Sequence, residues 1–480
     1  MTNVNSKLGN VASIPGYPRT PIIGNRANTL RFFADPVAHM FRLEREFGAI
    51  ASFTAGDSSL VCAFGAENNR VILSNPDIFH HSLNLPFSVP KGSAATRIFK
   101  GILSMNGATH RRCRRLLMPV VGKAAIASYS PRIVEITEHF ANRWPSQTPA
   151  NLVLDMHELT LRVSSYCLFG AEDENNDGSL GHLGLELLKC LSSPWTIVFP
   201  VNLAGTDYAR FLDCCTRLEL QLQQFIRVRL QDTTPRNDVL SMLIRARDED
   251  GQGFTEEEII ALTISMLFGG QDPLSNTLSW TLLLLAQHPQ ILADVQAELD
   301  SVLRGAPPTD SDLPRLVLLD AVIQESMRIF PAISHLIFRR ATESISLGPY
   351  QLPPGALVVL SPLVTHRDPA LYPNPRRFSP ERWKTLRPSA YEYMPFGAGP
   401  RMCIGASLSS QTLRLQLATI LRRFHPVLPP GLRVDHLLRA ANLGTQKPIW
   451  LAMVDRNNAP KAPTRLRGTI HELVELPTNG

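Results

Sequence analysis

Apolar positions along this chain are densest over residues 259–287, where they occupy most faces of a helical repeat. Thr255 and Glu258 precede this run with the spacing of a capping box, which indicates that a helix begins there. At about 1.5 Å per residue the helix would be roughly 45 Å long, enough to cross the whole molecule. A helix that is apolar on most faces is buried, so we expect it to lie in the core.

Shorter periodic segments precede and follow this helix. Helical spacing predicts further helices over residues 35–47, 109–117, 289–303, 313–330 and 406–423. Alternating apolar and β-branched residues predict a hairpin over 49–64 and a small sheet region over 336–363. Residues 80–107 carry few periodic signals and are predicted to be a long loop. The chain is therefore predicted to be mainly α with a minor β-sheet region.

The chain shows no internal repeat and no long linker, so we expect one domain over residues 1–480. Residues 1–20 are rich in Pro, Gly and Asn and predict an extended arm, and the polar residues 456–480 predict a loose tail. An apolar, Pro-bearing break covers residues 192–206. An apolar loop is costly to leave in water, so this break either covers a pocket or lies over ordinary core.

Composition narrows the class of protein. Hydrophobic residues make up 44% and charged residues 19%, which is typical of a globular protein. No apolar run approaches the roughly 20 residues that span a bilayer, so we expect no stable membrane insertion. The seven cysteines lack a Cys-x-x-Cys spacing, which favours a reducing cytoplasm over a disulfide framework. The net charge of +6 comes without a recognisable reading module, so we expect no nucleic-acid binding.

The densest run of positive charge is His110-Arg111-Arg112-Cys113-Arg114-Arg115. Such a run is often a solvated helix face. The alternatives are a docking surface for an acidic protein and a site for carboxylate groups.

The stretch over residues 396–405, Phe-Gly-Ala-Gly-Pro-Arg-Met-Cys-Ile-Gly, places three glycines around one arginine and one cysteine. Glycine lets a flat ligand approach the main chain closely. No second cysteine lies nearby, so a zinc or iron–sulfur site would lack its other ligands. A single thiolate can serve as the axial ligand of a haem iron, and the alternative is a buried apolar cysteine beside a turn.

This stretch resembles the haem-binding signature of the cytochrome P450 family, Phe-x-x-Gly-x-Arg-x-Cys-x-Gly, at every fixed position. The resemblance implies the P450 fold, a triangular-prism helical body around a buried haem b (iron protoporphyrin IX). It also implies that Cys403 is the proximal ligand of the iron, in a loop that contains Gly397 and Gly405. Phe396 would lie against the ring and the sulfur and limit the access of water.

Two further segments extend the resemblance. Glu325-Ser326-Met327-Arg328 matches the family's Glu-x-x-Arg helix pattern, and Pro375-Arg376-Arg377-Phe378 resembles its Pro-x-Arg-Phe segment. The implied structural triad is Glu325, Arg328 and Arg377, a buried carboxylate held by two guanidinium groups. Removing one member of such a set leaves an uncompensated buried charge.

The resemblance also implies a set of groups that bind the haem propionates. His110 and Arg114 resemble the Trp/His-x-x-x-Arg element of the family, and Arg401 matches another propionate contact. Arg339 resembles a third, for which Arg340 or His335 are alternatives. A guanidinium group suits a carboxylate because its donors match the two oxygens in pairs.

The central helix departs from the family pattern at one position. Members usually carry Ala/Gly-Gly-x-Asp/Glu-Thr, whereas this chain has Gly269-Gly270-Gln271-Asp272-Pro273. The family's acid–alcohol pair delivers protons to oxygen, and Pro273 has neither a hydroxyl nor an N–H. We therefore expect the helix to open or kink here. The proton-transfer set would be Asp272, with Asn276 or water in place of the missing hydroxyl at Pro273.

Three mechanisms are open at this stage. The chain is a monooxygenase that uses O2 and electrons from a redox partner, or it uses peroxide, or it catalyses a non-hydroxylating oxidation such as coupling, ring closure or rearrangement. From another class, it is a haem-binding protein without turnover.

The expected substrate is a hydrophobic small molecule, such as a terpenoid, polyketide or lipid-like natural product, because the segments implied to line the pocket are mostly apolar. The pocket residues implied are Phe268, Gly269, Ile333, Trp195 and Phe199. The expected reaction is hydroxylation or epoxidation. The expected partners are a ferredoxin or flavodoxin-type protein and its reductase, and the chain is expected to be a cytoplasmic monomer.

Overall fold

The computed structural model describes residues 12–21, 24–83, 85, 87–144, 148–170, 180–191, 193–232, 234, 236–439, 441–456 and 464–477. The backbone packs as two compact units, each built from segments that are separated along the chain. Unit 1 contains Met1–Leu83, Ser334–Pro373 and Pro388–Met402. Unit 2 contains Asn84–Ile333, Asn374–Arg387 and Cys403–Gly480.

Unit 1 is organised by a six-stranded sheet with the order β1-β2-β3-β9-β6-β4. Its strands are β1 (Gly16–Tyr17), β2 (Ile50–Thr54), β3 (Leu60–Ala63), β4 (Phe79–His81), β6 (Arg339–Ala341) and β9 (Leu357–Leu360). The predicted hairpin is confirmed, because β2 and β3 pair antiparallel with Ile50 opposite Ala63. The expected arm is extended from Ala12 onward, but it is tied to the sheet where β1 pairs with β2.

Helices and a second small sheet complete unit 1. They are α1 (Arg26–Ala34), α2 (Pro36–Phe47), α3 (Ala66–Leu73), α15 (Pro362–Thr365) and the pair β7 (Ile345–Leu347) and β8 (Tyr350–Leu352). Asp35 caps α2 by accepting a hydrogen bond from the amide of Ala38 at 3.0 Å. Met40 and Leu43 of α2 are fully buried and pack in a cluster with β2.

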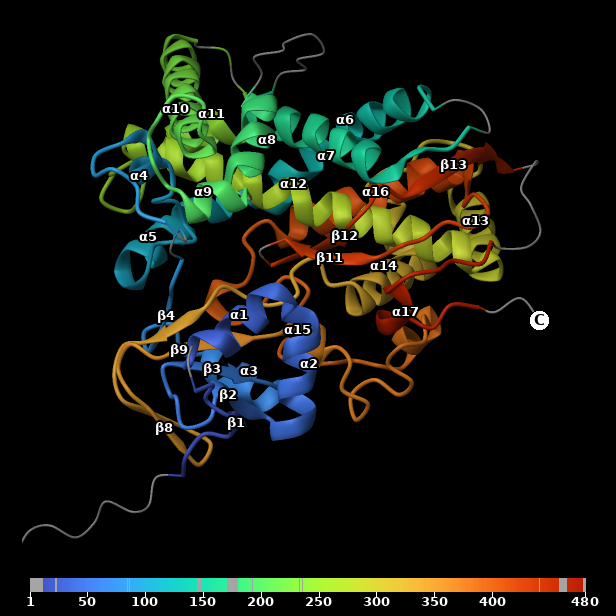
Figure 1. The fold of residues 1–480 in the computed structure, drawn as a ribbon. Coiled ribbons are helices and arrows are strands. Elements are labelled where there is room, and N and C mark those ends of the chain that lie inside the picture. Colours follow the sequence, from blue (N-terminus) through green and yellow to red (C-terminus); the bar gives the residue numbers. More distant parts are fainter. Residues whose placement is uncertain are drawn as a thin grey trace, which may run out of the picture. The chain divides into compact units, whose positions relative to one another are not determined.

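Unit 2 is mainly helical (Figure 1). Its longer helices are α5 (Gly107–Leu117), α6 (Lys123–Ala141), α7 (Leu152–Phe169), α8 (Leu180–Leu191), α10 (Asp207–Gln231), α12 (Glu256–Gln287), α13 (Pro289–Leu303), α14 (Val317–Ile329) and α16 (Ala406–Arg423). Its shorter helices are α4 (Ala94–Ile98), α9 (Pro194–Val198), α11 (Val239–Arg245) and α17 (Ile470–Leu473).

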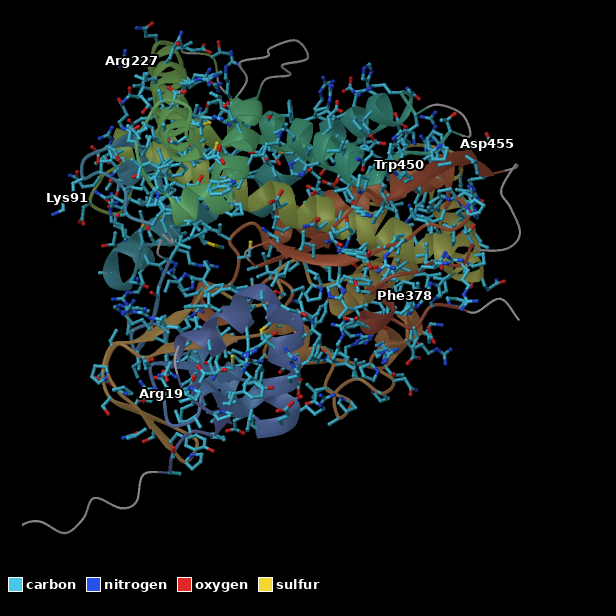
Figure 2. The ribbon with its side chains drawn as sticks, in the orientation of Figure 1. Arg19, Lys91, Arg227, Phe378, Trp450 and Asp455 are labelled. Carbon is cyan, nitrogen blue, oxygen red and sulfur yellow. The ribbon has the colours of Figure 1, made fainter. Side chains whose placement is uncertain are left out.

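Short strands add two small sheets to unit 2. One has the order β10 (Phe424–Val427), β13 (Trp450–Asp455) and β5 (Ala150–Asn151), and the other pairs β11 (His436–Arg439) with β12 (Asn442–Thr445). Trp450 and Asp455 mark the two ends of β13 in Figure 2. The predicted class, mainly α with smaller sheets, is confirmed.

The predicted central helix is α12, which begins with the predicted capping box. The amide of Glu258 donates to Thr255 Oγ1 at 3.2 Å, and the amide of Thr255 donates to a Glu258 carboxylate oxygen at 2.9 Å. The helix continues through Pro273, so the expected opening does not occur, while the alternative of a kink stays a prediction. Buried residues on both sides of the proline, such as Leu267 and Leu278, keep the two halves of the helix packed.

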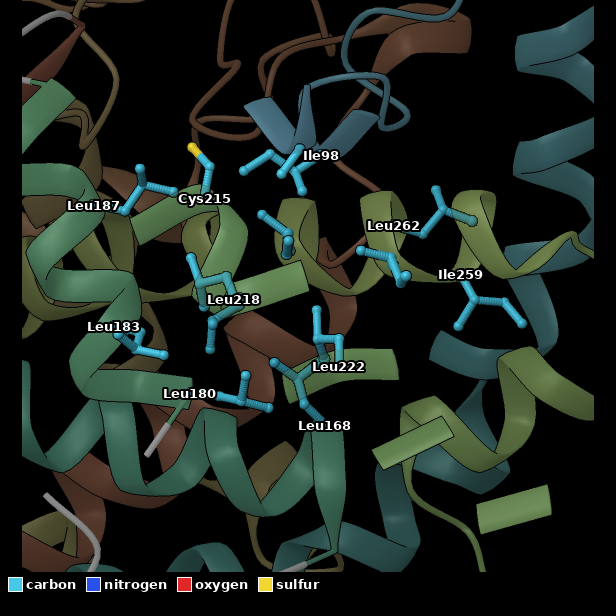
Figure 3. Packing of buried hydrophobic residues seen from close by; sticks show 14 of the residues in the cluster. Ile98, Leu168, Leu180, Leu183, Leu187, Cys215, Leu218, Leu222, Ile259 and Leu262 are labelled. Carbon is cyan, nitrogen blue, oxygen red and sulfur yellow. The ribbon is translucent and has the colours of Figure 1, made fainter. Parts of the chain in front are cut away.

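A hydrophobic core of unit 2 forms where α4, α8 and α12 pack against α10. Figure 3 shows leucines of α8 directed at leucines of α10, with α12 beside them. Leu187, Leu218 and Leu262 are fully buried. Burying a leucine side chain contributes about 1.5–3 kcal/mol, so this cluster supplies a large part of the driving force for folding.

Three expectations are corrected by the structure. The predicted loop over 80–107 contains α4, whose Ala95 and Ile98 are buried against α10 and α12. Residues 464–477 are not a loose tail, because α17 buries Ile470 and Leu473. The break over 192–206 does not lie over ordinary core in its described part, because its apolar side chains are largely exposed.

No helix within the described ranges combines the length and the apolar composition that a membrane crossing needs.

Candidate haem-thiolate site

Cys403 lies three residues before the start of α16, and neighbouring groups shift the pKa of its thiol. Of the seven cysteines, which are all free, Cys403 is exposed and the other six are buried. The surrounding protein keeps water away from the sulfur, and this desolvation raises the pKa of the Cys403 thiol. A hydrogen bond from the amide of Gly405 and the charge of Arg114 act in the opposite direction and lower it. The amide and the guanidinium both favour the thiolate, which is the form that binds a metal.

The loop before Cys403 belongs to unit 1, and it requires glycine at two positions. Gly397 and Gly399 both have φ of +70°, a region that other residues rarely adopt. A Cβ atom on Gly399 would also lie 2.3 Å from the carbonyl oxygen of Leu73. Phe396 is half-buried in the same loop. The two glycines thus give the loop a conformation that a chain of larger residues would not hold.

Helix α5 carries the two residues of unit 2 that are predicted to bind a haem propionate. His110 is buried, and Arg114 lies one turn further along the same face of the helix. Burial lowers the pKa of Arg114, and the Cys403 sulfur raises it. The structure therefore brings Arg114 close to Cys403.

Unit 1 places two of its predicted cations beside each other. Arg339 is only 4% exposed, and burial together with the charge of Arg401 lowers its pKa to about 9. A buried cation next to a second cation is costly unless an anion offsets the charge. The carboxylate groups of a haem would supply such an anion, so this pair fits the cofactor.

The two alternatives to Arg339 fit less well. Burial lowers the pKa of His335 to about 4, so its ring is neutral at neutral pH, and its Nδ1 lies 3.0 Å from Ser334 Oγ. Arg340 is exposed and donates a hydrogen bond to Ser82.

The buried carboxylate of Glu325 is held by a different pair of arginines from the one predicted. Arg328 donates two hydrogen bonds to it at 2.8 and 2.9 Å, and both side chains are fully buried. The second guanidinium is that of Arg382, whose Nε lies 2.9 Å from Glu325 Oε1. The indole of Trp383 and the amide of Ser379 also donate to the carboxylate, each at 3.0 Å.

Arg377 is therefore not the third member of the triad through its side chain. Its guanidinium is 66% exposed and lies 3.9 Å from Glu381, while its carbonyl accepts a hydrogen bond from Arg328. The sequence contained a signal for the correct residue, because Pro380-Glu381-Arg382-Trp383 repeats the Pro-x-Arg-aromatic pattern five residues later. Both arginines fit the pattern, and the path of the chain decides which one reaches Glu325.

One stripe of α12 is accessible although the helix is otherwise largely buried. Ser265, Gly269, Pro273 and Asn276 are half-buried or exposed, and they recur at the spacing of one helix face. Gly269 has no heavy atom within 4 Å of the position that a Cβ would take. An accessible stripe without a side chain at its centre suits a flat ligand that approaches the backbone closely.

The predicted proton-transfer residues lie on two faces of α12. Asn276 faces β12, since a Cβ on Gly444 would lie 3.3 Å from its Oδ1. Asp272 faces α7, where its Oδ1 lies 3.5 Å from His157 Nδ1. Ser275 lies on the Asp272 side, 3.4 Å from the same nitrogen. The sequence alone did not indicate His157 or Ser275, because no local pattern connects them to Asp272.

The predicted pocket residues are spread over unit 2. Phe268, on α12, is half-buried and packs against the hydrophobic core of unit 2. Ile333 forms a β-bridge with Asn442 at the start of β12. Trp195 and Phe199, on and just after α9, are 71% and 55% exposed. Ile333 and Asn276 are thus both placed next to β12, while Trp195 and Phe199 lie on an open apolar surface.

Comparison with known proteins agrees with this geometry. The family model for cytochrome P450 matches residues 14–448. Cyclooctatin synthase of Streptomyces melanosporofaciens is 32% identical over 360 residues, which cover 72% of this chain and 76% of that protein. Cyclooctat-9-en-7-ol 5-monooxygenase of the same organism is 30% identical over 432 residues, covering 87% and 89%.

More distant relatives extend the comparison to plants and to solved structures. Beta-amyrin 11-oxidase of Glycyrrhiza uralensis is 26% identical over 429 residues, covering 85% of this chain and 84% of that protein. A retinoic acid-bound cyanobacterial P450 structure matches with a TM-score of 0.82 at 23% identity, covering 93% of this chain and all of that one. The fold is thus the P450 fold, and this chain belongs to the cytochrome P450 family of haem-dependent monooxygenases.

Proposed function

We propose that this P450 hydroxylates or epoxidises a terpenoid or a similarly hydrophobic natural product, using O2 and electrons from a ferredoxin or flavodoxin-type partner and its reductase. The accessible stripe of α12 carries the proposal, because it offers a surface with no formal charge at Ser265, Gly269, Pro273 and Asn276. The names of the relatives support the substrate class, since cyclooctat-9-en-7-ol and beta-amyrin are terpenoids.

Each unit carries residues that would hold haem b. In unit 2, Cys403 would bind the iron, with His110 and Arg114 as partners for a propionate. In unit 1, Arg401 and Arg339 would bind propionate, with His335 less suited because its ring is neutral. When bound through a thiolate, haem supplies the activation of oxygen that the amino acids themselves cannot provide.

The side chains along α12 would control water and protons. Asp272 would hold a proton and transfer it, because its carboxylate is partly accessible and lies next to a titratable ring. Asn276, which lies one turn after Asp272, would position a water molecule or a polar group of the substrate. Pro273 would keep a hydroxyl and an N–H away from the centre of the stripe.

A second candidate mechanism follows from Pro273. Without the usual alcohol, the enzyme would use peroxide or carry out a non-hydroxylating oxidation, in which proton delivery matters less. The experiment supplies the purified enzyme with a panel of di- and triterpenes, once with O2, ferredoxin and reductase and once with peroxide. Oxygenated product in the first arm supports the proposal, and product in the peroxide arm alone contradicts it.

Replacing Pro273 by threonine restores the alcohol next to Asp272. We expect the Pro273→Thr variant to release about tenfold less peroxide per electron supplied, because positioned acid–base groups typically accelerate proton transfer by 10²–10⁴. Peroxide release and oxygen consumption measure the effect. Pro273→Ala is the matched control, since it removes the ring without adding a hydroxyl, and an equal effect of both variants would assign the change to the helix backbone.

The basic face of α5 is the proposed docking surface for an acidic redox partner, because Arg114 places this helix next to Cys403. Arg111 and Arg115 are exposed on this face, and Arg115 lies 3.1 Å from Glu249, whose carboxylate offsets part of its charge. Arg112 is tied internally to Asp248 at 3.0 Å and to the carbonyl of Gly253 at 2.6 Å, which corrects its expected role in docking.

We expect Arg111→Glu to slow reduction by an acidic ferredoxin about threefold to tenfold at low ionic strength, because complementary charges steer association. Stopped-flow reduction measures the rate. Arg227→Glu, on the exposed side of α10 (Figure 2), changes the net charge equally and is the control. Equal rates for the two variants, or an effect that persists at high salt, would contradict docking at α5.

The monomeric state and the cytoplasmic location stay predictions from the sequence.

A further inference from the structure

Three polar side chains meet where α7 packs along α12 (Figure 1). His157 Nδ1 lies 3.5 Å from Asp272 Oδ1 and 3.4 Å from Ser275 Oγ. Ser275 is 2% exposed, and its hydroxyl donates to the backbone carbonyl of Asp272 at 3.1 Å. Because an ionised carboxylate can only accept, this geometry assigns the proton of a neutral imidazole to Nδ1.

The cluster is poorly explained as packing alone. The other ring nitrogen of His157, Nε2, is buried without a hydrogen-bond partner. A buried polar atom without a partner costs about 1–3 kcal/mol, so an apolar residue would join α7 to α12 more favourably. The ring is nevertheless present, and its bonded nitrogen faces the acid that stands next to Pro273.

We propose that Asp272, His157 and Ser275 act as one proton-holding group, in which His157 positions the carboxylate and Ser275 supplies the hydroxyl that Pro273 lacks. This inference rests on the proposed proton-transfer role of Asp272. At rest the imidazole is neutral with its proton on Nδ1, and the carboxylate of Asp272 is ionised. The group takes up one further proton from water through the accessible parts of Asp272 and His157, which are 32% and 20% exposed, and it returns to the resting state when Asp272 passes that proton on.

The charges around the ring set the direction of its titration. Burial lowers the pKa of His157, Asp272 raises it, and Lys189 at the end of α8 lowers it. Helices α6 and α11 also pack on α7, and they contribute no charge that acts on the ring. The pKa of His157 is therefore below the ordinary histidine value, and the proton-bearing state is lost as the pH rises through it. Any activity that needs this state decreases as the pH rises.

The first test follows the His157 ring by NMR in the holoenzyme, using isotope-labelled histidine and the diamagnetic reduced form with carbon monoxide. His157→Gln identifies the signal. We expect Asp272→Asn to lower the pKa of His157 by about one unit or more, and Lys189→Gln to raise it. His139→Gln, a change of an exposed histidine on α6, is the control. A His157 titration that does not respond to Asp272→Asn overturns the proposal.

The second test measures peroxide released per electron with ferredoxin and reductase, as a function of pH. We expect His157→Gln to remove the pH dependence and Ser275→Ala to raise peroxide release about fivefold or more in the native background. In the Pro273→Thr background Ser275→Ala should have less than a twofold effect, because the alcohol is restored. Equal effects of Ser275→Ala in both backgrounds overturn the proposal. A native enzyme without thiolate ligation would instead contradict the assignment of Cys403 as the iron ligand. The NMR titration of His157 does not test that assignment.

Discussion

Replacement of Cys403 by serine is expected to abolish the thiolate signature in the absorption spectrum of the reduced, carbon monoxide-treated protein. The reason is that Cys403 is the exposed cysteine and the one whose thiolate is favoured by both a backbone amide and an arginine. Monooxygenase turnover should fall by at least 10³-fold, because the axial thiolate promotes cleavage of the O–O bond. The spectrum and the haem content per chain are the measurements.

Two further variants make this prediction specific. Cys403→His offers a neutral nitrogen ligand, so it should retain haem but show a different carbon monoxide spectrum. Cys190→Ala removes a buried thiol from the core of unit 2 and should leave the spectrum unchanged. A thiolate spectrum that persists in Cys403→Ser would show that another residue binds the iron.

Removal of the Arg382 side chain is expected to destabilise the protein by about 3–5 kcal/mol, because it leaves the buried carboxylate of Glu325 with one guanidinium instead of two. Glu325→Gln should have a similar effect, since Arg328 is fully buried and would lose its counter-charge. Urea unfolding of the haem-loaded enzyme, followed by circular dichroism and by haem absorbance, measures the loss.

Arg377→Ala is the matched control for this prediction. Its guanidinium is largely exposed and its contribution to the cluster is a backbone carbonyl, so the variant should change the free energy of unfolding by less than about 0.5 kcal/mol. The two arginines lie five residues apart in the same Pro-x-Arg-aromatic pattern. A larger loss for Arg377→Ala than for Arg382→Ala would contradict the geometry of the cluster.

Local features of the sequence determined a large part of the fold. The capping box at Thr255 and Glu258 located the start of α12, because both hydrogen bonds form within four consecutive residues. The hairpin of β2 and β3 followed from strict alternation over a short segment. The glycine-rich stretch before Cys403 could be recognised for the same reason, since its conformation depends on neighbouring residues and on positive φ at Gly397 and Gly399.

Tertiary structure decided which distant side chains act together. Arg382 reaches Glu325 across 57 residues, and His157 reaches Ser275 across 118, and no periodic pattern reports on such contacts. Packing also overrode a local preference, since α12 stays helical through Pro273 with buried residues such as Leu267 and Leu278 on both sides of it. The sequence by itself thus determined the start of α12, the hairpin of β2 and β3 and the glycine-rich loop before Cys403, because these depend on neighbouring residues. Only the folded chain decided how Glu325 and Asp272 are held, because that depends on which helix faces meet.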